Sequence, residues 1–216
     1  MQENTKMAKG DQTRQKIVEA AAAMFNQRGY EGASLAYLME KTGLKKGGIY
    51  RHFTSKEELA AEAFDYNWTV ARRARMEHID PESAGVERLK QLIANFIEYR
   101  SPVPGGCPIL NYAIDSDDGN PLLRERVSKA LRGWTRRIES LVREAIERGE
   151  VSAGTDPKTV ATLIIATLEG ALMISRLDRS DDALRRAEQH LYQYIDHDLA
   201  PRSAKKPALR KEKRSR

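Results

Sequence analysis

The chain has 216 residues, enough to bury a hydrophobic core in one domain or in two small ones. Apolar residues make up 40% of the chain and charged residues 31%, and the net charge is +6. No apolar run approaches the roughly 18 residues of a membrane span. We therefore expect a cytoplasmic protein with no membrane partner. One cysteine excludes an internal disulfide, and the four histidines lack metal-ligand spacing, so we expect no bound metal and no cofactor.

The positive charge gathers at both ends of the sequence. Residues 13–56 carry eight Lys or Arg against three Glu, residues 201–216 carry eight against one, and residues 57–200 are left with a net charge of −6. A basic head on an acidic body favours contact between the head and a polyanion, although a solvated charge asymmetry without a partner has the same pattern. We predict an N-terminal domain over 1–56, a second domain over 57–200 and a disordered basic tail over 201–216.

Helical periodicity runs along the whole chain, and no segment predicts a strand. Capping residues place the helix ends in the first part of the chain. Ser34 is a preferred N-cap, Gly43 is a preferred C-terminal stop, and Ser55 with Glu58 makes a capping box. The first four predicted helices run from near Thr13 to Gly29, from Ser34 to Gly43, over 44–53, and from Ser55 toward Met76.

Five further helices are predicted in the second part of the chain. The fifth carries Leu89 to Ile97, and the sixth covers 109–114. The seventh carries Leu123 to Ala145 and stops at Gly149. The eighth begins at Asp156-Pro157, and the ninth runs from about Asp181 to Leu199. The expected fold is therefore all-α, with about nine helices.

Residues 34–53 have the pattern of a helix-turn-helix: a short helix, a tight turn at Gly43 and a short basic helix. In this motif the second helix enters the major groove of DNA. Ile49 and Phe53, four residues apart, share its buried face. The adjacent Gly47 and Gly48 allow close approach of the backbone to base edges, unless both lie in the turn before the helix.

Two stretches carry a family resemblance. The first contains TRQKI and FNQRGY within residues 13–30, and the second is TGLKKGGIYRHFTSKEEL over 42–59. In order and spacing they resemble the DNA-binding domain of the TetR family of bacterial regulators. The resemblance implies an all-helical homodimer, usually a repressor, with a helix-turn-helix head and a ligand-binding and dimerisation body. It also implies that a small ligand releases the protein from a palindromic operator.

Single residues of the head take roles from this resemblance. Lys46, Tyr50 and Lys56 resemble the family's residues that contact the DNA backbone, whereas Lys45 stands where the family commonly has Ser or Thr. Lys45 is expected to donate either to guanine or to a phosphate, and Ser34 either caps its helix only or also holds a phosphate. The predicted DNA-binding residues are Ser34, Lys45, Lys46, Gly47, Gly48, Tyr50, Arg51, His52 and Lys56.

The resemblance also implies a ligand cavity among the helices beyond residue 60. Ordinary core packing is the alternative for each candidate, but as a set they combine aromatic rings with polar tips, which is typical of a mixed pocket. The predicted ligand-binding residues are Phe64, Trp68, Phe96, Tyr99, Cys107, Leu110, Asn111, Tyr112, Trp134, Met173 and Arg176.

The segment Gly105-Gly106-Cys107-Pro108 is the most distinctive part of the body. If Pro108 is the first helical residue, Cys107 is the N-cap, where the helix dipole lowers the thiol pKa below about 8.5 and favours the reactive thiolate. The segment also resembles a TetR subgroup with a Gly-Cys junction, some of whose members respond to reactive electrophiles. A small buried residue at a tight junction is the alternative.

The helix that begins at Pro157 is apolar over most of its circumference, which predicts cover on two sides, by its own core and by a partner. By resemblance, this helix and the last one form a four-helix interface in a homodimer. The predicted interface residues are Leu163, Ala166, Gly170, Ala171, Leu184, Leu191, Tyr194 and Ile195.

Two other classes of protein compete with this interpretation: a helical interaction protein without operator binding, and a cysteine-dependent enzyme. The basic helix and Lys56 argue against the first class. The chain shows no nucleophile–base motif and no phosphate-binding loop, which argues against the second. We expect a non-enzymatic regulator whose partners are operator DNA, a small-molecule or electrophile inducer, and a second copy of the chain.

Overall fold

The computed structural model describes residues 8–116 and 119–201, and every regular element in that part of the chain is a helix. The head contains α1 (Lys9–Arg28), α2 (Leu35–Thr42) and α3 (Lys46–Tyr50). The body contains α4 (Lys56–Met76), α5 (Gly85–Glu98), α6 (Pro108–Ser116), α7 (Pro121–Glu147), α8 (Pro157–Asp178) and α9 (Asp182–Gln193), with a π-helical turn η1 (Tyr194–Asp198) after α9. The all-α prediction is confirmed. The predicted tail beyond Pro201 lies outside the described residues.

Local capping explains most of the helix ends. The Ser34 hydroxyl accepts a hydrogen bond from the Tyr37 N–H at 3.3 Å, and Gly43 ends α2 at φ +72° in the left-handed region. The Ser55 hydroxyl accepts from the Glu58 N–H at 3.2 Å, as a capping box requires. The Glu58 carboxylate closes the box one residue earlier than predicted, because it accepts from the Thr54 N–H at 2.7 Å.

Helix α3 is shorter than the predicted helix over 44–53. It covers five residues, and the chain leaves it through a turn at Arg51 and His52. Ile49 and Phe53 are both buried in the head, as the spacing predicted, and they hold α3 against α1 and α2. The head therefore presents a very short, well-anchored helix at its tip.

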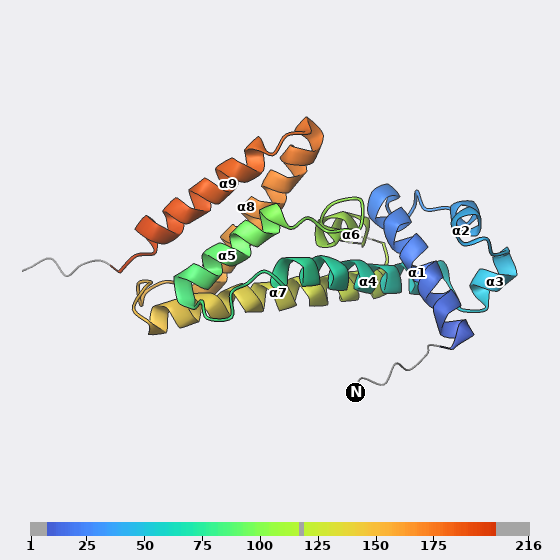
Figure 1. The fold of residues 1–216 in the computed structure, drawn as a ribbon, viewed down its shortest axis with the longest axis horizontal. Helices are drawn as coiled ribbons and strands as arrows, with labels where there is room; N and C mark the ends of the chain where they lie inside the picture. Colours follow the sequence, from blue (N-terminus) through green and yellow to red (C-terminus); the bar gives the residue numbers. More distant parts are fainter. Residues whose placement is uncertain (1–7, 117–118, 202–216) are drawn as a thin grey trace, which may run out of the picture.

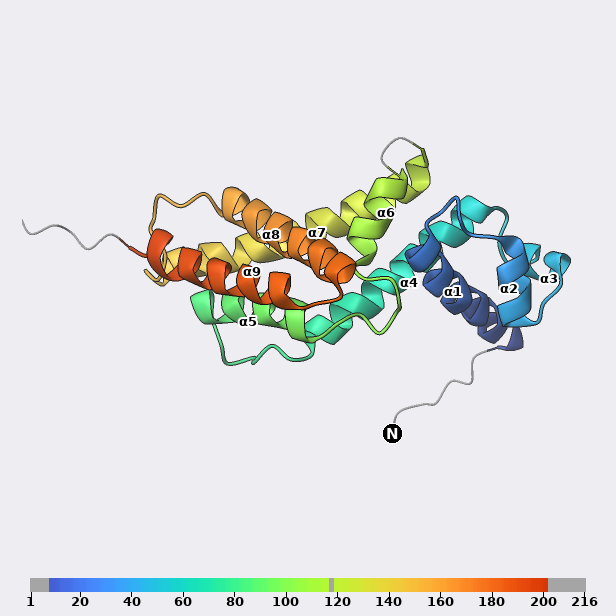
Figure 2. The ribbon, with the colours of Figure 1, turned by 90° about the horizontal axis from the view of Figure 1, so that it is seen from above.

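The molecule is elongated, with the head at one end and the body at the other (Figures 1 and 2). Helix α4 joins the two: its first half packs along α1, and it continues into the body beside α7. Helices α8 and α9 lie side by side over α5 and α7 (Figure 2). Because α4 has 21 residues, it spans about 30 Å from the head into the body.

By length and composition, α8 is the one helix in the described part of the chain that is apolar enough to cross a membrane. It packs against α7 and α9, and it carries the buried carboxylate of Glu169 near its middle. Several of its large apolar side chains remain exposed on the side away from this packing.

Candidate nucleic-acid interface and ligand cavities

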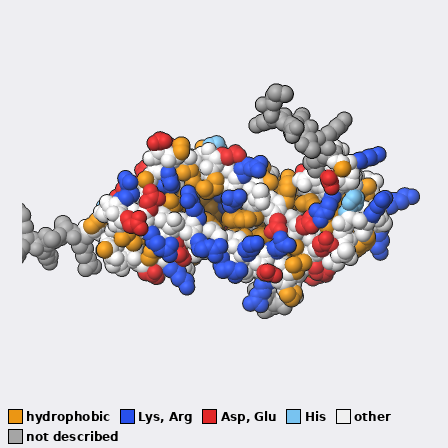
Figure 3. All heavy atoms as spheres, turned by 90° about the horizontal axis from the view of Figure 1, so that it is seen from below, with side chains coloured by type: hydrophobic (Ala, Val, Ile, Leu, Met, Phe, Trp, Pro, Cys, Tyr) orange, Lys and Arg blue, Asp and Glu red, His pale blue; other side chains and the backbone are white. Residues whose placement is uncertain are grey.

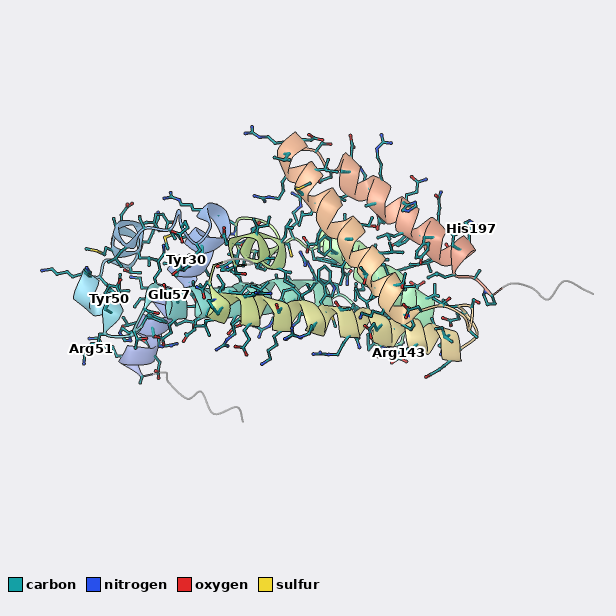
Figure 4. All side chains as sticks on the ribbon, turned by 180° about the vertical axis from the view of Figure 1, so that it is seen from behind. Tyr30, Tyr50, Arg51, Glu57, Arg143 and His197 are labelled. Carbon is teal, nitrogen blue, oxygen red and sulfur yellow. The ribbon has the colours of Figure 1, made fainter. Side chains whose placement is uncertain are left out.

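The exposed surface of α3 lies at the tip of the head. Lys46 and Tyr50 both face solvent, and the Lys46 ammonium lies 5.9 Å from the centre of the Tyr50 ring. Figure 4 shows Tyr50 and Arg51 together at this end of the molecule. A Cβ added at Gly47 would meet no atom within 4 Å, so the backbone there is open to approach. This geometry fits the insertion of α3 into a groove.

The other predicted DNA-binding side chains differ in their exposure to solvent and in their hydrogen bonds. Lys45 is exposed at the N-cap position, where its side chain caps no backbone group. Arg51 is exposed and His52 is half-buried. Ser34 uses its hydroxyl to cap α2. Two cationic side chains, those of Lys45 and Arg51, are thus exposed beside one short helix.

Lys56 lies at the start of α4 in a cluster with Tyr30 and Glu57. Its ammonium lies 4.4 Å from the centre of the Tyr30 ring, and the Tyr30 hydroxyl donates to Glu57 at 2.6 Å. Burial, followed by this hydrogen bond, raises the pKa of Tyr30, and the same bond lowers the pKa of Glu57. Tyr30 and Glu57 lie close together where the head meets α4 in Figure 4. The cluster holds Lys56 at the head-facing end of α4.

The side-chain amides of Asn26, which is buried, and Asn111, which is half-buried, join the head to the body. The Asn26 side chain, near the end of α1, donates to Pro104 O at 2.9 Å and to Gly106 O at 3.3 Å. The Asn111 side chain on α6 donates to both oxygens of Asn26, each at 3.0 Å, and to Gly105 O at 2.9 Å. Asn111, predicted to line the ligand cavity, is therefore part of a structural network between α1 and the α5–α6 loop.

Two more contacts continue this junction. The Asp115 carboxylate of α6 accepts from the Tyr30 N–H at 2.8 Å, just beyond the end of α1. The Asn67 side chain of α4 donates to Ala22 O at 2.9 Å and to the Tyr112 hydroxyl at 3.1 Å. Helices α1, α4 and α6 thus meet through hydrogen bonds as well as apolar packing, while the Asn67 Oδ1 is buried without a donor among the described residues.

A cavity of about 640 Å³ opens between α4, α5 and α7; we call it the aromatic cavity. Three predicted residues line it: Trp68, Phe96 and Trp134. The Phe96 and Trp134 rings stack at 5.6 Å, and Trp68 lies 6.2 Å from Trp134. In Figure 3, which views the α4 and α7 side, apolar side chains lie in a central hollow with Lys and Arg side chains along its edge.

A second cavity of about 530 Å³, the polar cavity, lies between the α5–α6 loop and the end of α8. Phe96 and Arg75 line both cavities, and the Arg75 guanidinium lies 4.1 Å from the centre of the Phe96 ring. Arg176, also predicted, lies in the polar cavity next to Gly106. The Arg75–Phe96 pair is therefore a shared wall.

The remaining predicted ligand residues lie elsewhere. Phe64 and Tyr112 are fully buried and pack edge to face at 5.2 Å, so they belong to the core. Tyr99 stacks on His78 at 3.6 Å, and Leu110 packs against the core. Met173 is half exposed on α8, because its position on the helix turns it away from both cavities.

Cys107 directly precedes Pro108, the first residue of α6, and its carbonyl accepts the Asn111 N–H at 3.1 Å. The predicted N-cap position is confirmed. The predicted low thiol pKa is wrong: burial, followed by the nearby Glu169 carboxylate, raises the pKa of Cys107 to about 12. Loss of hydration outweighs the helix dipole because the thiol is almost completely enclosed.

Comparison with known proteins agrees with this architecture. Residues 17–63 match the family described as bacterial regulatory proteins, tetR family, and residues 85–191 match the tetracyclin repressor-like C-terminal domain. A TetR transcriptional regulator from Chloroflexus aurantiacus J-10-FL is 44% identical, with a TM-score of 0.85 over 89% of this chain and 98% of that one. The chain belongs to the TetR family.

Two other relatives extend the comparison. A TetR-family regulator from Cytophaga hutchinsonii is 31% identical, with a TM-score of 0.83 over 94% of this chain and 100% of that one. The HTH-type transcriptional repressor DhaR of Mycobacterium sp. (strain GP1) is 24% identical over 172 residues, which cover 79% of this chain and 86% of DhaR. The chain is accordingly a DNA-binding transcriptional regulator and not an enzyme.

The TetR resemblance predicted an interface on α8 and α9, and the structure divides the predicted residues into two groups. Leu184, Leu191, Ile195 and Ala171 are buried inside the single chain. Leu163 and Ala166 are exposed, and Gly170 and Tyr194 are half-buried. The α9 residues are buried because the apolar stripe of α9 covers the body's own core, and the dimer interface itself stays a prediction.

Sequence reasoning missed all of the charged residues that line the aromatic cavity. Helical spacing carried a signal, because positions 126, 129, 133, 136 and 137 fall on one face of α7, and 72 and 75 lie one turn apart on α4. The cations that line the cavity are Arg72, Arg75, Arg126, Lys129, Arg136 and Arg137.

Proposed function

We propose that this TetR regulator is a repressor that binds a palindromic operator as a homodimer in the cytoplasm and is released from it by a small molecule. The observation that carries the proposal is the exposed surface of α3. Lys46 and Tyr50 project from a helix that Ile49 and Phe53 anchor to the head, and Gly47 leaves the backbone open. A rigid basic helix of this kind presents its side chains to the major groove.

The exposed face of α8 supports the homodimer. Leu163 is 45% exposed and Leu177 is 77% exposed, and Ala166 and Gly170 lie between them at helical spacing. Small residues between large apolar ones let two helices approach closely. A second copy of α8, related by two-fold symmetry, covers this face and doubles the recognition helices, so that they meet two half-sites.

Ligand release requires a connection between cavity and head. Helix α4 provides one, because Arg75 and Trp68 line the aromatic cavity, and Lys56 at the other end lines a small pocket together with Ile49 and Tyr50 of α3. The amide network of Asn26 and Asn111 provides a second connection, since it ties α1 to the loop that lines the polar cavity. A ligand that favours one position of α4 therefore biases the spacing of the two heads.

The predicted inducer is either a non-covalent small molecule or an electrophile, and the burial of the Cys107 thiol favours the non-covalent ligand. Cys107 is buried and its pKa is raised, so the reactive thiolate is scarce near neutral pH. An electrophile would reach the thiol only after the α5–α6 junction opens.

The proposal is tested by fluorescence anisotropy with a labelled DNA fragment from directly upstream of the protein's own gene. The wild-type protein should bind it with higher affinity than a shuffled fragment of the same composition. Lys46→Ala should weaken binding to both fragments, because it removes a phosphate contact. Equal affinity of the wild type for the two fragments would contradict operator recognition.

A further inference from the structure

The edge of the aromatic cavity carries far more positive than negative charge. Six of its fourteen lining residues are Lys or Arg, and Asp65 is the one acidic residue among them. Asp65 is already paired with Arg126 at 2.6 Å. Among the described residues, the other five cations have no carboxylate within ion-pair distance. This excess occurs in a domain whose net charge is negative.

Two of these guanidinium groups are incompletely satisfied. The Nε atoms of Arg75 and Arg137 are buried and have no hydrogen-bond acceptor in the described part of the chain. A buried donor without an acceptor is unfavourable, and like charges held near one another repel. Both penalties disappear when an anion enters and accepts hydrogen bonds from the guanidinium groups.

The floor of the cavity has the opposite character. Trp68, Phe96 and Trp134 form a continuous aromatic surface, and Leu92 and Met76 complete it. Gly133 leaves a gap in the α7 wall, since a Cβ added there would meet no atom within 4 Å. The volume of about 640 Å³ suits an organic molecule rather than an inorganic ion.

We infer that the aromatic cavity binds an organic anion with a flat aromatic body, such as an aromatic carboxylate or sulfonate. The rings of Trp68 and Trp134 pack against the body of the ligand, while Arg137 and Arg75 bind its anionic group. The inference rests on the proposed ligand-released repressor and specifies the ligand class. Because Arg75 belongs to α4, the bound anion acts on the helix that leads to the head.

The test compares two fluorescent probes with the same carbon skeleton: 8-anilinonaphthalene-1-sulfonate, which is anionic, and N-phenyl-1-naphthylamine, which is neutral. The chain's two tryptophans, Trp68 and Trp134, both line the cavity, so quenching of their emission reports binding in or near it, and the Arg137 variants show whether the probe occupies this site. The full-length wild-type protein should bind the sulfonate at least about tenfold more tightly than the neutral probe.

Arg137→Gln should weaken sulfonate binding by about tenfold and leave binding of the neutral probe unchanged, which also shows that the cavity is still folded. Arg137→Lys should retain most of the preference for the anion. Arg143→Gln is the matched control, because Arg143 lies on the same helix, exposed and outside the cavity (Figure 4). Equal affinity for the two probes, or no effect of Arg137→Gln, would overturn the inference.

An operator-release assay with the same probes separates this inference from the proposed function. Tight sulfonate binding without release of DNA supports the anion site and contradicts ligand release through it. Release by the neutral probe alone supports ligand release and contradicts the anion site.

Discussion

Replacing Asn26 with alanine should destabilise the protein by about 2–3 kcal/mol, because three side-chain hydrogen bonds disappear at the junction of head and body. Each such bond contributes about 1 kcal/mol net, and the bond to Gly106 O, at 3.3 Å, is the weakest of the three. The matched control is Asn95→Ala. Asn95 is equally buried but makes a single side-chain bond, to Arg75 O at 2.9 Å, so its loss should cost about 1 kcal/mol.

The assay is guanidinium denaturation of the full-length protein, followed by tryptophan fluorescence and far-UV circular dichroism. All variants are measured at one fixed protein concentration, since the stability of the proposed dimer depends on concentration. A double-mutant cycle of Asn26→Ala with Asn111→Ala should give a coupling energy of about 1 kcal/mol, because the two side chains share a bond. A stability loss for Asn26→Ala no greater than that for Asn95→Ala would refute the assigned role of the network.

Three further predictions concern the α3 surface, the thiol and the dimer. Lys46→Ala should reduce the slope of log affinity against log salt by about 0.9 in a DNA titration, and an unchanged slope would exclude a phosphate contact. Since the pKa of Cys107 is raised from 9.0 to about 12, the folded state favours the protonated thiol. The contribution of this preference to the free energy of unfolding is complete below about pH 9. That contribution should decline by about 1.4 kcal/mol per pH unit between pH 9 and 12. If the free energies of unfolding of wild type and Cys107→Ser, plotted against pH, stay parallel over this range, the burial argument is contradicted. Leu163→Glu should give a monomer in light scattering, because it places an unpaired charge in the proposed interface. The variant should still fold, because Leu163 is exposed within one chain. An unchanged dimer would place the interface elsewhere.

The sequence by itself determined the elements whose causes are local. Ser34, Gly43 and Ser55 mark helix ends because capping depends on a few neighbouring residues, and the structure confirms all three. The helix-turn-helix followed from the same local signals together with the buried pair Ile49 and Phe53. The family was visible for the same reason, since its motif is nearly continuous along the chain.

The tertiary structure alone decided properties that depend on distant residues. The dipole argument for Cys107 was correct about position and wrong about pKa, because the enclosing groups, Glu169 among them, come from helices far away in sequence. Periodicity showed that α8 and α9 carry apolar stripes, but only packing decided that Leu191 faces the core and Leu163 faces solvent. The cationic edge of the aromatic cavity exists because α4 and α7 lie side by side, and no local pattern specifies which helices become neighbours.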